Sequence, residues 1–136
     1  MRILVADDEE MNRSLLEALL ARLGHSTITT DSARGALGIL LNPNTHGTVD
    51  CLMTDNQMPT GNDGLELLAN IKTIWPSTGL PTLATVFMSG RAYESGYKAM
   101  ALGAIVLPKP FDMNALKEVI REAEKRVPKE PATAAK

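Results

Sequence analysis

The sequence has few features other than an apolar core that could hold a fold together. Its 136 residues include one cysteine, Cys51, so no internal disulfide can form, and a lone thiol fits a reducing compartment. Aromatic residues make up only 4%, so aliphatic and methionine side chains must fill the core. The length and the apolar content of 44% are those of one globular domain, in which we expect Cys51 to be an inert buried side chain.

The sequence also lacks a membrane segment and a strong net charge. No apolar run approaches the ~20 residues that span a bilayer. Residues 7–10 (DDEE) interrupt the first apolar stretch before it could serve as a signal peptide. The formal net charge of −2 gives no overall attraction to nucleic acid or to anionic lipid. We therefore expect a cytoplasmic protein without membrane insertion and without direct nucleic-acid binding.

Short apolar runs alternate with longer amphipathic ones along the chain. Residues 3–6 (ILVA) are typical of a strand buried on both faces, and the leucines at three- and four-residue spacing that follow predict a helix ending at Gly24. Five strand–helix units in strict alternation predict an α/β fold with a parallel sheet and helices on both of its faces. The remaining strands are expected at 26–30, 50–54, 81–89 and 104–107, and the remaining helices at 32–41, 65–75, 94–102 and 113–127, the last capped by Asp112.

Smaller features complete the predicted outline. Pro76 should close the third helix, because proline has no backbone N–H to donate. Residues 128–136 (PKEPATAAK) are rich in proline and alanine and are expected to be disordered, which leaves residues 1–127 as one domain. His25 and His46 lie in turn contexts, where we expect both to be exposed to solvent and to take no part in catalysis.

Charged and hydroxyl side chains occur where each of four predicted strands ends. In a parallel sheet these ends meet at one edge, where ligands bind. Carboxylates about 4 Å apart repel by roughly 4 kcal/mol per pair at an effective dielectric of 20, so such a cluster needs cations to stay ionised. A divalent metal and a lysine would together balance three aspartates, and ligation by oxygen alone suits magnesium. The side chains in question are Asp7, Asp8, Asp55, Ser89 and Lys109.

Five motifs at these positions resemble the receiver domain of bacterial response regulators, and of single-domain chemotaxis-like regulators in particular. The resemblance covers residues 2 to about 127. It implies a doubly wound (βα)5 fold whose five-stranded parallel sheet has the order 2-1-3-4-5. The motifs are ILVADDE at 3–9, DNQMP at 55–59, GNDGL at 61–65, MSG at 88–90 and KPF at 109–111.

The resemblance implies a phosphoryl site around Asp55. This aspartate would be the nucleophile that attacks the phosphorus of a phosphohistidine and becomes the phosphorylated residue. Lys109 would stabilise the phosphoryl oxygens as a charge-assisted donor, and Ser89 would move to hydrogen-bond the phosphoryl group after its transfer. Backbone amides near Asn56 and Gly90 would complete the cradle.

The resemblance also implies a metal site beside it, for Mg²⁺ or Mn²⁺. Asp8 and Asp55 would bind the metal directly, together with the backbone carbonyl of Gln57, and Asp7 would hold a metal-bound water. Two variable positions of the family flank the phosphoryl group, Gln57 and Arg91. We predict that their side chains influence the lifetime of the phosphoaspartate.

One position departs from the family pattern. Most receivers carry Tyr or Phe in the fifth strand, three residues before the lysine, and this aromatic side chain changes rotamer together with the hydroxyl. The sequence has Val106 there. Our hypothesis is that phosphorylation is signalled without an aromatic switch, through Ser89 and the loop that follows it.

The function that the resemblance implies is that of a phosphoacceptor in a two-component system, rather than an enzyme. It would take its phosphoryl group from a histidine kinase or a histidine phosphotransfer protein, assist its own phosphorylation and dephosphorylation, and signal by conformational change to a downstream protein partner that the sequence does not identify. A strand directly after Met1 suggests a native N-terminus, and only residues 128–136 follow the last helix, so we favour a stand-alone receiver.

Three alternatives remain. The chain could be a receiver fragment of a hybrid kinase or of a multidomain regulator. It could be a degenerate receiver that acts only as an interaction module, although the strand-end residues are intact. A magnesium-dependent hydrolase on a similar sheet would need a general acid or base close to its nucleophile, and no candidate for that role stands out.

Overall fold

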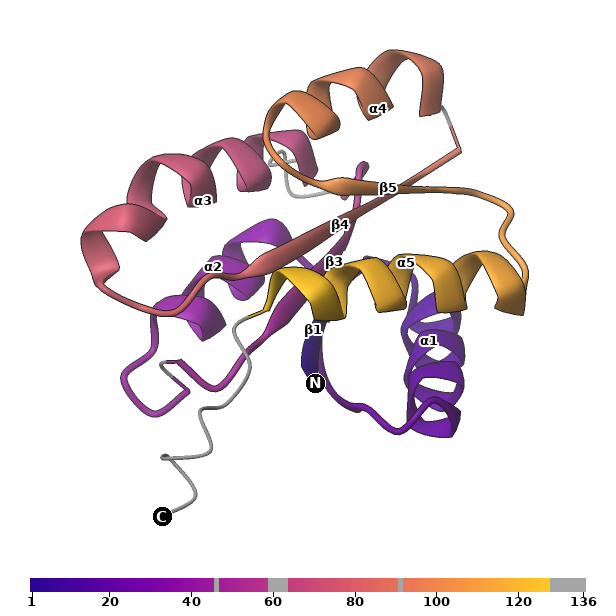
Figure 1. Cartoon of the computed structure of the whole chain (residues 1–136), viewed down its shortest axis with the longest axis horizontal. Helices are drawn as coiled ribbons and strands as arrows, with labels where there is room; N and C mark the ends of the chain where they lie inside the picture. Colours follow the sequence, from indigo (N-terminus) through magenta and orange to yellow (C-terminus); the bar gives the residue numbers. More distant parts are fainter. Residues whose placement is uncertain (46, 59–63, 91, 128–136) are drawn as a thin grey trace.

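The computed structural model describes residues 1–45, 47–58, 64–90 and 92–127, except for the side chains of 92–94. Over these residues, five strands alternate with five helices (Figure 1). None of these helices is long and apolar enough to cross a membrane. The expected disordered tail lies outside the described residues. In chain order the elements are β1 (Arg2–Ala6), α1 (Glu10–Arg22), β2 (Ser26–Thr30), α2 (Ala33–Leu41), β3 (Cys51–Asp55), α3 (Gly64–Thr78), β4 (Ala84–Ser89), α4 (Ala92–Ala101), β5 (Ile105–Pro108) and α5 (Met113–Arg126).

The five strands form one parallel sheet in the order β2-β1-β3-β4-β5, which confirms the predicted fold. The central strands β1 and β3 are buried almost throughout, whereas β2 lies at an edge and is half exposed, as its polar sequence STITT indicates. In the register of β1 with β3, Ala6 lies opposite Thr54. The residues that follow these two, Asp7 and Asp55, therefore leave the sheet side by side.

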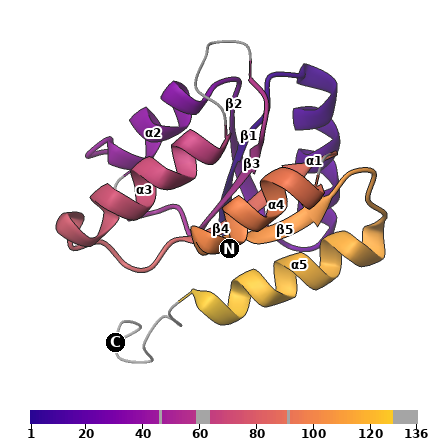
Figure 2. The same ribbon diagram turned by 90° about the horizontal axis from the view of Figure 1, so that it is seen from above.

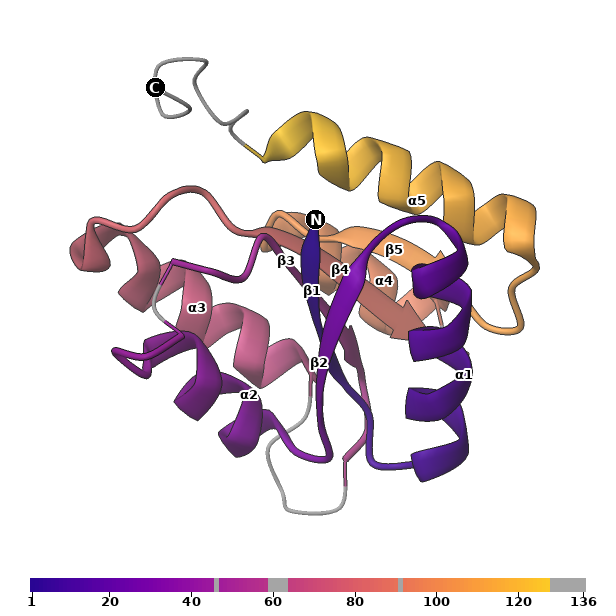
Figure 3. The same ribbon diagram turned by 90° about the horizontal axis from the view of Figure 1, so that it is seen from below.

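Helices cover both faces of the sheet. The helices α1 and α5 pack on one face, and α2, α3 and α4 pack on the other (Figure 3). The helices α2 and α3 lie side by side, and together they cover the half of their face over β1 and β3 (Figure 2). The apolar cluster beneath α4 is small: its described buried members are Leu68, Phe87, Ala99 and Ala104.

The predicted helix end at Gly24 and the predicted cap at Asp112 are both confirmed, and Gly103 ends α4 in the same way as Gly24 ends α1. Gly24 and Gly103 follow α1 and α4 with φ of 91° and 90°, a backbone conformation that glycine adopts without strain. Asp112 caps α5, since its carboxylate accepts a hydrogen bond from the backbone N–H of Ala115 at 2.8 Å. This cap sets the direction in which α5 leaves the segment that carries Lys109.

The prediction that Pro76 closes the third helix is wrong. The helix α3 runs on to Thr78 with Pro76 inside its last turn. A proline so close to the helix end removes only one hydrogen bond, and the Thr78 hydroxyl donates to the carbonyl of Trp75 at 2.7 Å. Side-chain bonds of this kind stabilise a last turn that the backbone alone would hold less well.

Two titratable side chains are buried away from the strand ends that carry the charged residues. The expectation of an exposed His25 is wrong, since its side chain is 7% exposed and its Nδ1 lies 2.8 Å from the amino group of Met1. Burial, followed by the positive amino group, lowers the pKa of His25, although Glu124 opposes the shift. Cys51 is fully buried, as predicted, and burial raises the pKa of its thiol to about 12. His46 lies outside the described residues.

Candidate functional site

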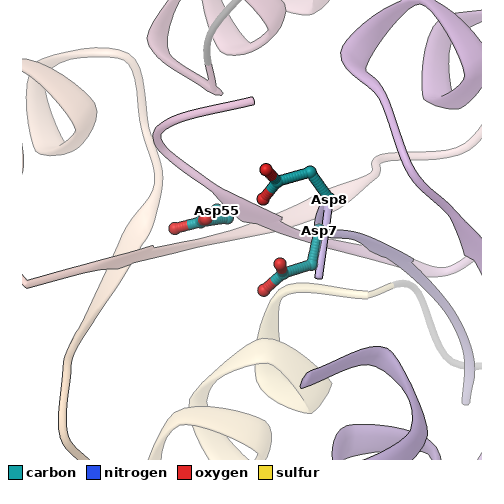
Figure 4. A group of neighbouring side chains, drawn as sticks. All are labelled: Asp7, Asp8 and Asp55. Atoms are coloured by element: carbon teal, nitrogen blue, oxygen red, sulfur yellow. The ribbon is translucent and has the colours of Figure 1, made fainter. Parts of the chain in front are cut away.

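Three carboxylates meet where β1 and β3 end. Asp7 and Asp8 directly follow β1, and Asp55 is the last residue of β3. One carboxylate oxygen from each lies within 4.8 Å of the other two, and the side chains extend to one side of the strand ends (Figure 4). Asp7 is fully buried, Asp55 is partly buried and Asp8 is exposed. The cluster thus runs from the interior of the fold to its surface.

Asp7 is the buried member of this cluster, and one of its oxygens is incompletely satisfied. Its Oδ1 accepts a hydrogen bond from the backbone N–H of Glu9 at 2.9 Å. Its Oδ2 is buried and has no hydrogen-bond partner among the described residues, and the ammonium group of Lys109 lies 3.7 Å away. A buried carboxylate oxygen without a close partner is unfavourable, so this position is suited to a cation or to a water bound to one.

Asp55 is held by a lysine and by a backbone amide. Its Oδ1 accepts hydrogen bonds from Lys109 Nζ at 3.1 Å and from the Asn56 N–H at 2.9 Å. The backbone N–H of Lys109 donates to the carbonyl of Ser89 at 2.9 Å, which fixes the lysine next to the end of β4. Burial raises the pKa of Asp55, and Asp7 adds to the shift, whereas Lys109 opposes it. The carboxylate therefore lacks part of the positive charge that it needs.

The donor set fits a hard divalent cation. Three carboxylates cluster together, two of them (Asp7 and Asp55) pair with the Lys109 ammonium group, and every candidate ligand atom is an oxygen. Magnesium prefers such oxygen ligands and keeps some of its waters, which an exposed carboxylate such as that of Asp8 permits. The acidic cluster of Asp7, Asp8 and Asp55 could therefore hold a metal ion, as the sequence led us to expect.

A pocket of about 230 Å³ opens beside Asp55. It is far larger than the ~10–15 Å³ that one water needs, so a small tetrahedral anion fits beside bound water. Ser89 contributes its hydroxyl from the end of β4 and is 3% exposed. Described residues that line the pocket are Asp55, Asn56, Gln57, Ser89, Gly90 and Lys109.

The structure brings nearly all of the predicted site residues together. The six residues lining the pocket were all expected there, and Asp7 and Asp8 adjoin them through the carboxylate cluster. Arg91 lies outside the described residues, so its predicted place beside the phosphoryl group stays a prediction. The roles assigned to the other residues follow below as proposals.

Gly64 supports the site in a way that the sequence did not reveal. Its backbone N–H donates to the carbonyl of Asn56 at 2.6 Å, and a Cβ at this position would overlap the carbonyl oxygen of Asp55. The first residue of α3 therefore packs directly against the backbone of the acidic residue. Gly64 belongs to the GNDGL motif at 61–65, which contributed to the family resemblance without indicating this contact.

Comparison with known proteins identifies the family. The chain matches the response regulator receiver domain over residues 3–121, and it therefore belongs to that family. Members of this family are generally phosphoacceptors rather than classical enzymes, and they pair with histidine kinases. The expected family and fold are thus both confirmed.

Individual relatives agree with this assignment. The DNA-binding transcriptional regulator NtrC of Azospirillum brasilense is 39% identical over 123 residues, which are 89% of this chain but only 24% of that regulator. A receiver domain protein of Clostridium thermocellum aligns at 28% identity with a TM-score of 0.79, covering 92% of this chain and 94% of that one. The response regulator TrrA of Thermotoga maritima, solved in complex with Mg²⁺-BeF, aligns at 27% identity with a TM-score of 0.73, covering 90% and 97%.

Proposed function

We propose that this protein is a phosphoacceptor of a two-component system, which takes a phosphoryl group onto Asp55 with Mg²⁺ or Mn²⁺ bound beside it. One observation carries the proposal. Asp55 shares a pocket with Lys109 and Ser89, and its carboxylate belongs to a three-aspartate cluster that fits a divalent cation. The donor would be a histidine kinase or a histidine phosphotransfer protein in the cytoplasm.

Transfer to Asp55 requires positioning and charge neutralisation. A carboxylate oxygen of Asp55 attacks the phosphorus, and the phosphorus–nitrogen bond of the donor histidine breaks as the new phosphorus–oxygen bond forms. Lys109, already 3.1 Å from Asp55 Oδ1, neutralises charge on the transferred oxygens. The Ser89 hydroxyl and the backbone amides near Asn56 and Gly90 bind the remaining oxygens.

The proposed metal site adjoins the pocket through the cluster of Asp7, Asp8 and Asp55. Asp8 and Asp55 would hold the ion directly with the backbone carbonyl of Gln57, and Asp7 would hold one of its waters. When bound, the ion offsets negative charge on the carboxylates and on the phosphoryl group. Among the described residues, Asp7 Oδ2 accepts no hydrogen bond and has Lys109 only at 3.7 Å, and the pKa of Asp55 is raised; both support this assignment because they indicate a shortage of positive charge.

The phosphorylated protein would signal to a protein partner through a change of conformation. Gln57 lines the pocket and is exposed, so its side chain is positioned to influence the water that hydrolyses the phosphoaspartate. We propose the same for Arg91. The match to NtrC covers 24% of that regulator. The second candidate function is therefore that of a receiver segment within a multidomain regulator or a hybrid kinase.

Intact mass spectrometry after incubation with a small phosphodonor and Mg²⁺ tests the proposal. The wild-type protein should gain the mass of one phosphoryl group, and Asp55→Asn should gain none. Asp50→Asn is the matched control, because Asp50 lies at the opposite end of β3, where its carboxylate accepts a hydrogen bond from the Arg2 N–H at 2.8 Å. Absence of an adduct on both the wild type and the control would instead favour an interaction module.

A further inference from the structure

A second buried hydroxyl lies next to the pocket. Ser95, on α4, is 7% exposed, and its Oγ lies 3.4 Å from the Oγ of Ser89, which is 3% exposed. Buried hydroxyls normally have hydrogen-bond partners, so a pair of them facing each other between a helix and a strand end is a specific contact. The distance is longer than the ~2.8 Å typical of hydroxyl pairs, and the bond is therefore weak and readily exchanged for a better acceptor.

The helix that carries Ser95 rests on a small apolar base. It lies over β4 and β5 (Figure 1), and of its described side chains Ala99 joins the cluster beneath it. Tyr97 and Met100 point away from the core and are 71% and 60% exposed. Because the described apolar cluster under α4 is small, the polar contact of Ser95 with the end of β4 contributes to what sets the position of this helix.

The aromatic side chain beneath α4 occupies a different strand from the one that the family pattern predicts. Val106 lies opposite Phe87 in the register of β4 with β5, and Phe87 is fully buried. Its ring packs in the cluster between the sheet and the helices α3 and α4. A change at Ser89 therefore cannot act through an aromatic ring at position 106. Ser95, by contrast, is in direct contact with Ser89.

We propose that Ser95 is a positioning residue that couples the phosphoryl site to α4, an inference that rests on the proposed phosphorylation of Asp55. In the unphosphorylated protein the Ser95 hydroxyl binds that of Ser89. When Ser89 turns to a phosphoryl oxygen on Asp55, this pair breaks and α4 is released from the end of β4. The pair thus favours the unphosphorylated conformation and opposes binding of a phosphoryl group.

Calorimetric titration of the whole protein with beryllofluoride and Mg²⁺ measures how far the hydroxyl pair weakens binding of a phosphoryl group. Ser95→Ala should bind the phosphoryl mimic roughly two- to tenfold more tightly than the wild type, the range for one weak hydrogen bond. Ser95→Thr keeps the hydroxyl and should restore the wild-type affinity. Thr85→Val is the matched control, since it removes another buried hydroxyl of this layer, near the opposite end of β4, and should leave the affinity unchanged.

A double-mutant cycle with Ser89→Ala separates coupling from a structural effect. In the Ser89→Ala background, Ser95→Ala should no longer change the affinity, because its partner is already absent. The Gly96 amide supplies a second readout by NMR: in Ser95→Ala without ligand, its resonance should lie nearer to the position that it takes in the ligand-bound wild type. Should Ser95→Ala fail to fold, the nearly isosteric Ser95→Cys, a much weaker donor, makes the same comparison.

Each outcome decides between the two proposals. The coupling role of Ser95 would be overturned if Ser95→Ala left the affinity for beryllofluoride unchanged or lowered it. It would also be overturned if Ser95→Ala raised this affinity equally with and without the Ser89 hydroxyl. Each of these results would leave the phosphoacceptor function intact. A wild-type protein that binds no beryllofluoride in the presence of Mg²⁺ would overturn the phosphoacceptor function itself, and the coupling with it.

Discussion

The two sides of the pocket are built differently. On the acidic side, Asp7 and Asp55 leave two adjacent central strands, and Lys109 lies within 3.7 Å of the first and 3.1 Å of the second. On the hydroxyl side, Ser89 meets Ser95 across 3.4 Å, from a helix resting on a small cluster. The comparison supports the proposal that a firmly positioned Asp55 lies next to a pair of hydroxyls whose mutual contact is long enough to break.

The packing behind each side accounts for this difference. The end of β1 is supported on one face of the sheet by the large cluster under α1 and α5, which includes Val5, Leu16 and Leu116. The cluster under α4 has far fewer buried members, and alanine accounts for half of those described. As far as the described residues show, moving α4 therefore exposes less apolar surface than displacing the carboxylates, which requires disruption of the main core.

Removal of the lysine should have the largest effect on the acidic side. Lys109→Met deletes the only ammonium group among the described residues lining the pocket, so phosphorylation by a small phosphodonor should slow by about 100-fold or more. The rate is measured by intact mass against time. Lys117→Met, on the exposed surface of α5, is the control and should keep the wild-type rate. A loss below tenfold would mean that the acidic side does not depend on its lysine.

Gly64 provides a test of the backbone that supports Asp55. Gly64→Ala forces a Cβ against the Asp55 carbonyl, and we expect it to destabilise the fold by about 2 kcal/mol and to slow phosphorylation. Gly38→Ala is the matched control, since nothing lies within 4 Å of its Cβ position in α2 and the change should be neutral or stabilising. Denaturant unfolding of both variants measures the difference. Equal stability of both would show that β3 and α3 separate easily.

Most of the fold, and the acidic side of the site, could be predicted from the sequence. Strand–helix alternation specified the parallel sheet, and the carboxyl ends of its strands then placed Asp7, Asp55 and Lys109 together. The contact of Ser95 with Ser89 could not be predicted, because it depends on how α4 sits over the sheet. The burial of His25 could not be predicted either, because it depends on tertiary packing and not on the local sequence.

Replacement of Asp55 should raise stability while abolishing function. Burial raises the pKa of this carboxyl, so its ionised form destabilises the folded state at neutral pH. Without metal, Asp55→Asn should therefore be more stable than the wild type by about 1 kcal/mol at pH 7. The gain should shrink as the pH falls toward 3.8, the ordinary value for aspartate, and Mg²⁺ should reverse it by stabilising the wild type more. A less stable variant at pH 7 would mean that Lys109 fully compensates the charge.

The smallest expected effect concerns His25, whose burial is remote from both sides of the pocket. Its pKa is lowered, so the unfolded chain binds the proton more tightly, and stability should fall as the pH drops below the ordinary value of 6.5. His25→Gln should remove this pH-dependent part of the stability, which we expect to stay below about 1 kcal/mol. Urea unfolding of both proteins at pH 7.5 and 5.5 measures it. The same variant should phosphorylate at the wild-type rate, whereas a slower rate would show that packing at the far end of β1 reaches the acidic side.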